Sequence, residues 1–124
     1  MKRFSIAGEI HTQYRFPIAD GVEVHPGRLY GFDANGHLVA PANAAAGRRM
    51  VYAQEHATGD AAATRKALCA VSVIALIPKA NLTSADRGKR VFAVSEQETS
   101  ATDNGKPCGV LLDVDETTAA ILLG

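Results

Sequence analysis

Residues 28–39, RLYGFDANGHLV, carry the pattern that decides the fold. Apolar residues stand on both sides of the four-residue segment DANG at positions 33–36. Asn-Gly between two apolar runs is the strongest short-range signal for a β-hairpin, because both residues tolerate the positive φ that tight hairpin turns require. The stretch therefore predicts two antiparallel strands joined by a turn.

The rest of the chain repeats this pattern of short strands between turns. Glycine and proline recur at close intervals, which leaves little room for a long helix. One helical turn is expected near residues 83–88, because Thr83 and Asp86 resemble a capping box and Gly88 follows them. The apolar run 67–77 ends at Pro78 and predicts one buried central strand. Other strands are expected at 21–25, 48–54, 91–96, 109–114 and 119–123.

These elements predict an all-β protein, a small β-barrel or sandwich of about seven to eight short strands. The length of 124 residues suits one domain, divided into an N-terminal arm at 1–20 and a single β domain at 21–124. The core is expected to be thin, because 22 of the hydrophobic residues are alanine and there is no tryptophan. A small domain with a thin core gains stability by sharing surface with copies of itself.

Composition argues against several classes of protein. Thirteen Lys and Arg against 13 Asp and Glu leave no basic surplus for general nucleic-acid binding. The longest apolar run is too short to cross a bilayer, and no apolar signal segment follows the start, so we expect no membrane contact and residence in the cytoplasm where the chain is made. Cys69 and Cys108 lack CxxC spacing and are expected to be free and buried.

Charge is divided along the chain although its sum is zero. Residues 65–90 are basic, and residues 91–124 are acidic. Two interpretations are open. Adjacent strands of one fold could neutralise each other's charge, or the basic and acidic segments could form complementary faces that meet between subunits.

No group of residues indicates catalysis, a cofactor or a metal. The four histidines are scattered without metal-ligand spacing, and neither a glycine-rich phosphate loop nor a paired cysteine motif is present. The acidic stretch 113–116 is explained by a solvated turn. Two alternatives stay open: a thiol enzyme built on Cys108 with His37 or His56 as base, and an OB-like nucleic-acid module using Phe4, Tyr14, Phe16 and the basic stretch 87–90.

Three segments resemble the head decoration proteins of tailed phages, also called capsid cement proteins. The first is 26–41, PGRLYGFDANGHLVAP, followed after a small-residue loop by VYAQE at 51–55. The second is 82–94, LTSADRGKRVFAV, and the third is 108–115, CGVLLDVD. The resemblance covers about residues 25–123 and leaves the N-terminal arm unmatched. The chain departs from the family at Tyr52-Ala53, where the related strand usually carries glycine.

The resemblance implies a non-enzymatic structural virion protein on the exterior of an icosahedral phage capsid, made and assembled in the host cytoplasm. It implies that the major capsid protein is the partner and that the chain forms a homotrimer, with no direct contact to nucleic acid. Because the arm has no core of its own, we expect capsid contact from five of its residues; the alternative is that they form an ordinary first strand. These residues are Arg3, Phe4, Ile6, Arg15 and Phe16.

Overall fold

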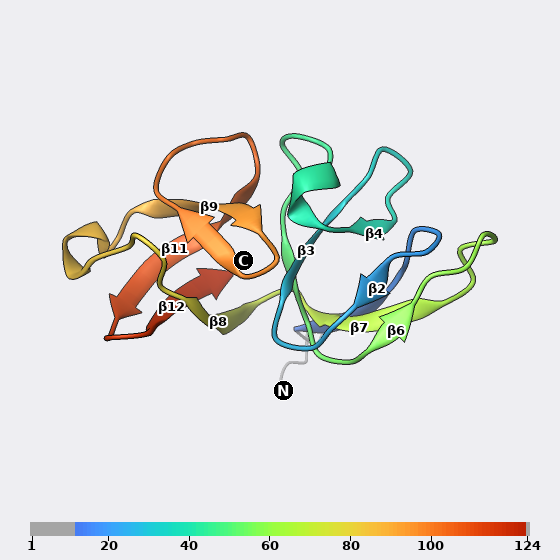
Figure 1. Cartoon of the computed structure of the whole chain (residues 1–124), viewed down its shortest axis with the longest axis horizontal. Helices are drawn as coiled ribbons and strands as arrows, with labels where there is room; N and C mark the ends of the chain where they lie inside the picture. The colour runs from blue at the N-terminus through green and yellow to red at the C-terminus, as the bar shows by residue number, and fades with distance from the viewer. Residues whose placement is uncertain (1–11, 124) are drawn as a thin grey trace, which may run out of the picture.

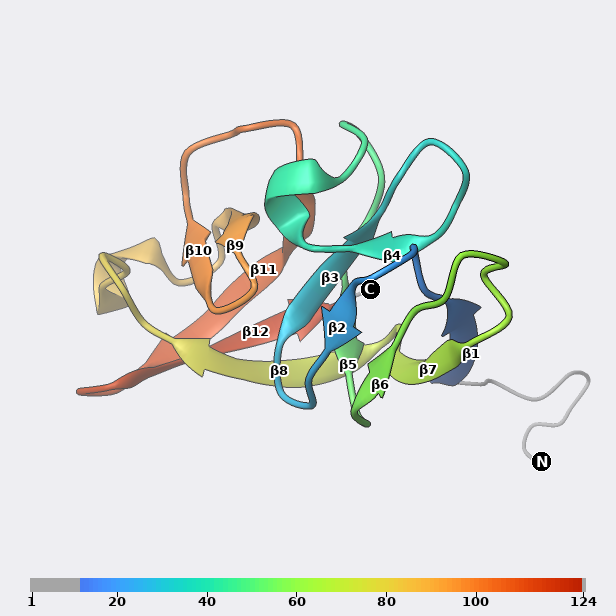
Figure 2. The same cartoon turned by 45° about the vertical axis from the view of Figure 1, so that its right-hand side comes forward.

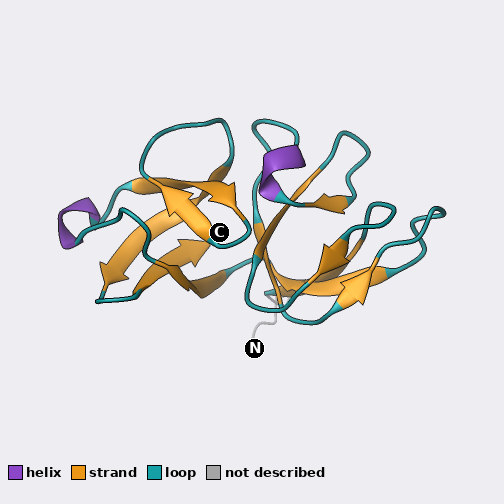
Figure 3. Ribbon diagram, viewed as in Figure 1, coloured by secondary structure: helices purple, strands orange, loops and turns teal. Residues whose placement is uncertain are grey.

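A computed structural model describes residues 12–123, and within them the chain folds into twelve strands and two 3-10 turns (Figure 1). The turns are η1 (Pro41–Asn43) and η2 (Ser84–Asp86), drawn as the two short helical segments in Figure 3. The strands are β1 (Gln13–Pro17), β2 (Glu23–Val24), β3 (Leu29–Phe32), β4 (Leu38–Val39), β5 (Val51–Ala53), β6 (Ala57–Thr58), β7 (Lys66–Ala70), β8 (Val73–Pro78), β9 (Arg90–Ser95), β10 (Glu98–Ser100), β11 (Pro107–Val114) and β12 (Thr118–Leu123).

The strands form two five-stranded sheets that lie side by side, with a two-stranded ribbon against the first (Figures 1 and 2). The N-terminal sheet has the order β1-β7-β5-β3-β4, the C-terminal sheet the order β10-β9-β11-β12-β8, and the ribbon is β2-β6. A single isolated bridge lies between Ile18, the residue after β1, and Leu38 of β4. The sheets do not close into a barrel, so the arrangement is sandwich-like and the predicted all-β class is confirmed.

Strand β3 and the start of β5, together with the preceding Met50, contribute side chains to two hydrophobic cores. Leu29 and Met50 pack in the C-terminal core with the inner residues of β8, β9, β11 and β12. Tyr30 and Val51, the next residue in each case, pack in the N-terminal core with β7 and Ile18. Successive side chains of a strand point to opposite faces, so this pair of strands separates the two cores and holds them together.

The hairpin predicted from residues 28–39 is confirmed. Strands β3 and β4 pair antiparallel, and the Asp33 carboxylate accepts the backbone N–H groups of Asn35 and His37 at 2.9 Å each. Gly36 alone supplies the positive φ, +80°, in this turn. The helical turn predicted near 83–88 is also present as η2, where the Asp86 carboxylate accepts the N–H of the preceding Thr83 at 2.9 Å.

The number of strands exceeds the seven or eight expected, and the strand predicted at 67–77 is wrong. The chain breaks at Val71–Ser72 into β7, in the N-terminal sheet, and β8, in the C-terminal sheet. Strand β8 is an edge strand with one exposed face, rather than a buried central one. The sequence does not separate the two strands, because Val71 and Ser72, which lie between them, are apolar or small and contain no glycine or proline to mark a turn.

The last part of the predicted arm lies within the fold. Strand β1 pairs with β7 along its whole length, from Gln13 opposite Ala70 to Pro17 opposite Lys66. Ile18 is fully buried in the N-terminal core. Residues 13–18 are therefore part of the sheet, whereas residues 1–11 lie outside the described residues.

Candidate functional site

The outer surface of the C-terminal sheet is apolar, and we call its residues the apolar face. Four of its side chains are strongly exposed, with 53% of Ile74, 59% of Leu76, 40% of Leu112 and 44% of Leu122 accessible to solvent. They come from three neighbouring strands, β8, β12 and β11. A contiguous set of large exposed apolar side chains is typical of a surface that contacts another molecule. The apolar face consists of Ile74, Leu76, Val110, Leu112 and Leu122.

Strand register assembles this face from residues far apart in the sequence. Ile74 pairs with Leu122, and Leu122 pairs with Val110, so the three side chains form a row across β8, β12 and β11. Arg90 of β9 continues the row, because it pairs with Val110. The neighbouring residue of each of the three apolar positions faces inward and is buried. These inward residues are Ala75, Ile121 and Leu111, all members of the C-terminal core.

A hollow of about 400 Å³ lies at the arginine end of the row. Arg49 and Arg90 line it together with Val110 and Leu122 of the apolar face. The Arg90 guanidinium lies 5.7 Å from the centre of the Phe92 ring, a cation–π distance that favours an ordered side chain. The combination of apolar side chains with two guanidinium groups at their edge suits a protein surface that offers apolar residues and a carboxylate.

Two of the five residues predicted to contact a capsid are described by the structure. Arg15 is exposed on β1 and forms an ion pair with Glu55. Phe16 is half-buried and packs edge-on against Phe32, with ring centroids 5.0 Å apart, at the border of the N-terminal core. Phe16 thus contributes to packing as an ordinary strand residue does. The other three, Arg3, Phe4 and Ile6, lie outside the described residues.

The two alternative functions draw on residues that the structure describes in part. The nucleic-acid alternative uses Tyr14 and Phe16, which lie on β1 of the N-terminal sheet. Its basic stretch 87–90 leads into β9 of the C-terminal sheet, so these aromatic and basic residues belong to different sheets. Both cysteines are free and buried, as predicted. Burial raises the pKa of the Cys108 thiol to about 12, so this group stays protonated near neutral pH and lacks the thiolate that a nucleophile requires.

The acidic stretch 113–116 covers the end of β11 and the start of the turn that follows it, and its Asp113 contacts the basic part of the chain. Asp115 accepts the backbone N–H groups of Thr117 and Thr118, which holds the turn between β11 and β12. The Arg87 guanidinium donates to the Asp113 carboxylate at 2.6 and 3.1 Å, and this hydrogen bonding lowers the pKa of Asp113. At this pair, the basic and acidic segments neutralise each other within one fold.

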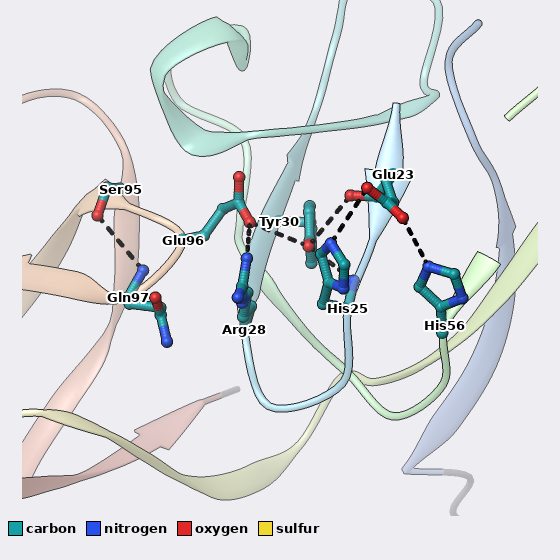
Figure 4. A network of polar contacts seen from close by, with 8 residues as sticks. All are labelled: Glu23, His25, Arg28, Tyr30, His56, Ser95, Glu96 and Gln97. Carbon is teal, nitrogen blue, oxygen red and sulfur yellow. Dashed lines mark hydrogen bonds and ion pairs between the residues drawn. The ribbon is translucent and has the colours of Figure 1, made fainter. Parts of the chain in front are cut away.

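The structure brings together one group of metal-ligating side chains that the sequence analysis missed. Glu23, His25 and His56 lie on and beside the β2-β6 ribbon, and one ligand atom from each lies within 4.8 Å of the others (Figure 4). The two histidines are 31 positions apart and share no motif spacing. Only the pairing of β2 with β6 brings these residues together. The sequence gives no local signal for this pairing, because each strand has only two residues.

Comparison with known proteins found no matching family model, no matching curated protein and no matching solved structure. Among residues 12–123, no helix has the length and apolar character needed to cross a membrane.

Proposed function

We propose that this chain is a structural virion protein that decorates the outside of an icosahedral phage capsid and cements neighbouring capsid subunits. The observation that carries the proposal is the apolar face of the C-terminal sheet, where four large side chains on three strands are 40–59% exposed. Apolar surface of this extent is costly to leave in water, so it favours a function in which another protein covers it.

Two of the three segments that resemble decoration proteins support the same function, because they form strands of the C-terminal sheet that carries the apolar face. Residues 108–115 form most of β11, the middle strand of the C-terminal sheet. Residues 82–94 contain η2 and most of β9. The third segment, residues 26–41, forms the β3–β4 hairpin of the N-terminal sheet, and its Leu29 packs in the C-terminal core.

The partner we propose for the apolar face is the major capsid protein. The face would bury its leucine and isoleucine side chains against an apolar patch of the shell, and Arg49 and Arg90 in the adjoining hollow would meet carboxylates at the edge of that patch. A homotrimer presents three such faces at once. Each additional contact then forms at a high effective concentration, so weak individual contacts add up to a firm clamp.

The test is co-sedimentation with expanded heads made from the major capsid protein of the phage that carries this gene. We expect the wild-type chain to bind, and Leu122→Asp to weaken binding by about tenfold or more, because it places a charge at the centre of the buried row. Ala62→Asp is the matched control: Ala62 is exposed in the turn before β7, away from the C-terminal sheet, and this variant should bind like the wild type.

Light scattering on the same three proteins separates the surfaces, and we expect a trimer for each of them. A wild-type chain that does not sediment with shells would refute the decoration function. Unchanged shell binding by Leu122→Asp, together with a loss of the trimer, would assign the apolar face to contact between copies of the chain. Salt-sensitive binding to single-stranded nucleic acid with no shell binding would favour the OB-like alternative.

A further inference from the structure

The β2-β6 ribbon carries two histidines and a carboxylate in one cluster, remote in sequence from the apolar face. In the ribbon Glu23 pairs with Thr58 and Val24 with Ala57, so the next antiparallel positions are His25 and His56. The two imidazole rings accordingly lie side by side, with centroids 5.1 Å apart and planes inclined by 35°. Glu23 is two residues before His25 and its side chain projects from the same face of the strand.

The ligand atoms of the three residues lie close together. The two carboxylate oxygens of Glu23 divide between the rings: Oε2 lies 2.9 Å from His56 Nε2 and Oε1 lies 3.4 Å from His25 Nε2 (Figure 4). Ligands of a tetrahedral zinc ion stand about 2.0–2.2 Å from the metal, and therefore roughly 3.2–3.6 Å from one another. Both carboxylate–imidazole separations are thus close to those around a bound zinc ion, and the ligand atoms of the two histidines lie within 4.8 Å of each other.

The backbone that carries His25 is held in place by a buried side chain. The His25 N–H donates to the Tyr30 hydroxyl at 2.8 Å, and that hydroxyl donates to the Glu96 carboxylate at 3.1 Å (Figure 4). Tyr30 is fully buried, so it anchors the end of β2 to the N-terminal core. A strand fixed in this way presents its ligands without an additional entropic cost of ordering the backbone.

We propose that Glu23, His25 and His56 form a binding site for one Zn²⁺ ion. Two imidazoles and one carboxylate are a zinc donor set, whereas Mg²⁺ and Ca²⁺ prefer oxygen ligands alone. The side chains of Glu23 and His56 are 55% and 56% exposed, so the ion faces solvent and keeps room for water or for a ligand from a partner protein. The site is independent of the decoration function, since it uses no residue of the apolar face.

Zinc titration of the full-length, untagged chain by isothermal calorimetry near neutral pH tests the site. We expect one zinc ion per chain, and a loss of affinity of about tenfold or more in His56→Gln and in His25→Gln, because each removes one of three ligands. His37→Gln is the matched control, because His37 lies in the β3–β4 turn and belongs to no ligand cluster among residues 12–123. It should bind zinc like the wild type.

Thermal unfolding with and without zinc supplies a second readout, since an ion that binds the folded state alone raises the unfolding temperature. We expect this rise in the wild type and in His37→Gln, and not in the other two variants. Should a histidine variant fail to fold, as judged by circular dichroism, Glu23→Gln replaces it with the same expectation. Equal zinc affinity in the wild type and in a His25→Gln/His56→Gln double variant would overturn the proposal, as would the absence of wild-type binding.

Discussion

The hydroxyl of Tyr30 connects the two halves of the protein, and its removal should be measurable as a loss of stability. Tyr30 belongs to the N-terminal core, whereas its acceptor Glu96 follows β9 of the C-terminal sheet. Tyr30→Phe removes the hydrogen bond to that carboxylate and leaves the His25 N–H without its partner. Loss of bonds of this kind costs about 1–3 kcal/mol, mostly through the unsatisfied groups left behind.

Urea unfolding followed by circular dichroism measures this loss, since the chain has no tryptophan to report by fluorescence. A loss of about 1–3 kcal/mol lowers the urea midpoint by roughly 1 M for a small protein. Tyr14→Phe is the control, because the Tyr14 side chain is 64% exposed and its variant should unfold like the wild type. Equal midpoints for Tyr30→Phe and Tyr14→Phe near neutral pH would refute the reasoning.

The stability difference between the wild type and Tyr30→Phe should also depend on pH in the alkaline range. Burial raises the pKa of Tyr30 to about 12 from its ordinary value of 10.0. Between pH 10 and 12 the folded state therefore keeps the Tyr30 proton that the unfolded state loses. The contribution of the protonated Tyr30 hydroxyl to the free energy of unfolding is complete below pH 10 and is lost as the pH rises toward 12. Two pKa units correspond to about 2–3 kcal/mol, and the advantage of the wild type over Tyr30→Phe should shrink by this order across that window. A constant difference between the two proteins from pH 9 to 12 would contradict the assignment.

Two further predictions concern the C-terminal core and the thiols. Gly109→Ala should destabilise the protein by about 1–3 kcal/mol in urea unfolding, because a Cβ at this position would lie 2.1 Å from the Leu122 carbonyl oxygen. The control is Leu112→Ala, at an exposed position of the same strand, which should change the stability by less than about 0.5 kcal/mol. Equal effects of the two substitutions would disprove the close packing at Gly109. Cys69 and Cys108 should not react with a thiol reagent in the folded protein, because both are buried and burial raises the pKa of each thiol to about 12. Both should react after denaturation in guanidinium chloride. Rapid reaction of the folded protein would contradict the burial of the thiols.

Local sequence signals predicted those parts of the fold that depend on neighbouring residues. The DANG turn at 33–36 forms the expected hairpin because its geometry follows from a side-chain cap by Asp33 and the positive φ of Gly36. The helical turn at η2 depends in the same way on Thr83 and Asp86, three positions apart. The alternation of exposed and buried side chains along residues 73–78 is not visible in the sequence, because all six residues, VIALIP, are apolar and continue the apolar run of β7.

The candidate sites depend on pairings between distant segments, and these could not be predicted from one sequence. The apolar face exists because β8, β12 and β11 align Ile74, Leu122 and Val110 in one row. A shift of one residue in either pairing would turn these side chains into the core. The approach of His25 to His56 likewise follows from the register of a ribbon with only two residue pairs.

The sequence by itself determined the all-β class and the turns, because turn chemistry and the alternation of apolar residues act over a few positions. It also predicted that both cysteines are free and buried, because they lack CxxC spacing and free cysteine is usually buried. Only the tertiary structure decided that β3 buries side chains on both of its faces, with Leu29 in one core and Tyr30 in the other. It also decided which apolar residues remain exposed and which histidines meet. The physical reason is that sheet order and register are settled by the burial of whole faces against one another, a balance of non-local contacts that no short stretch of sequence contains.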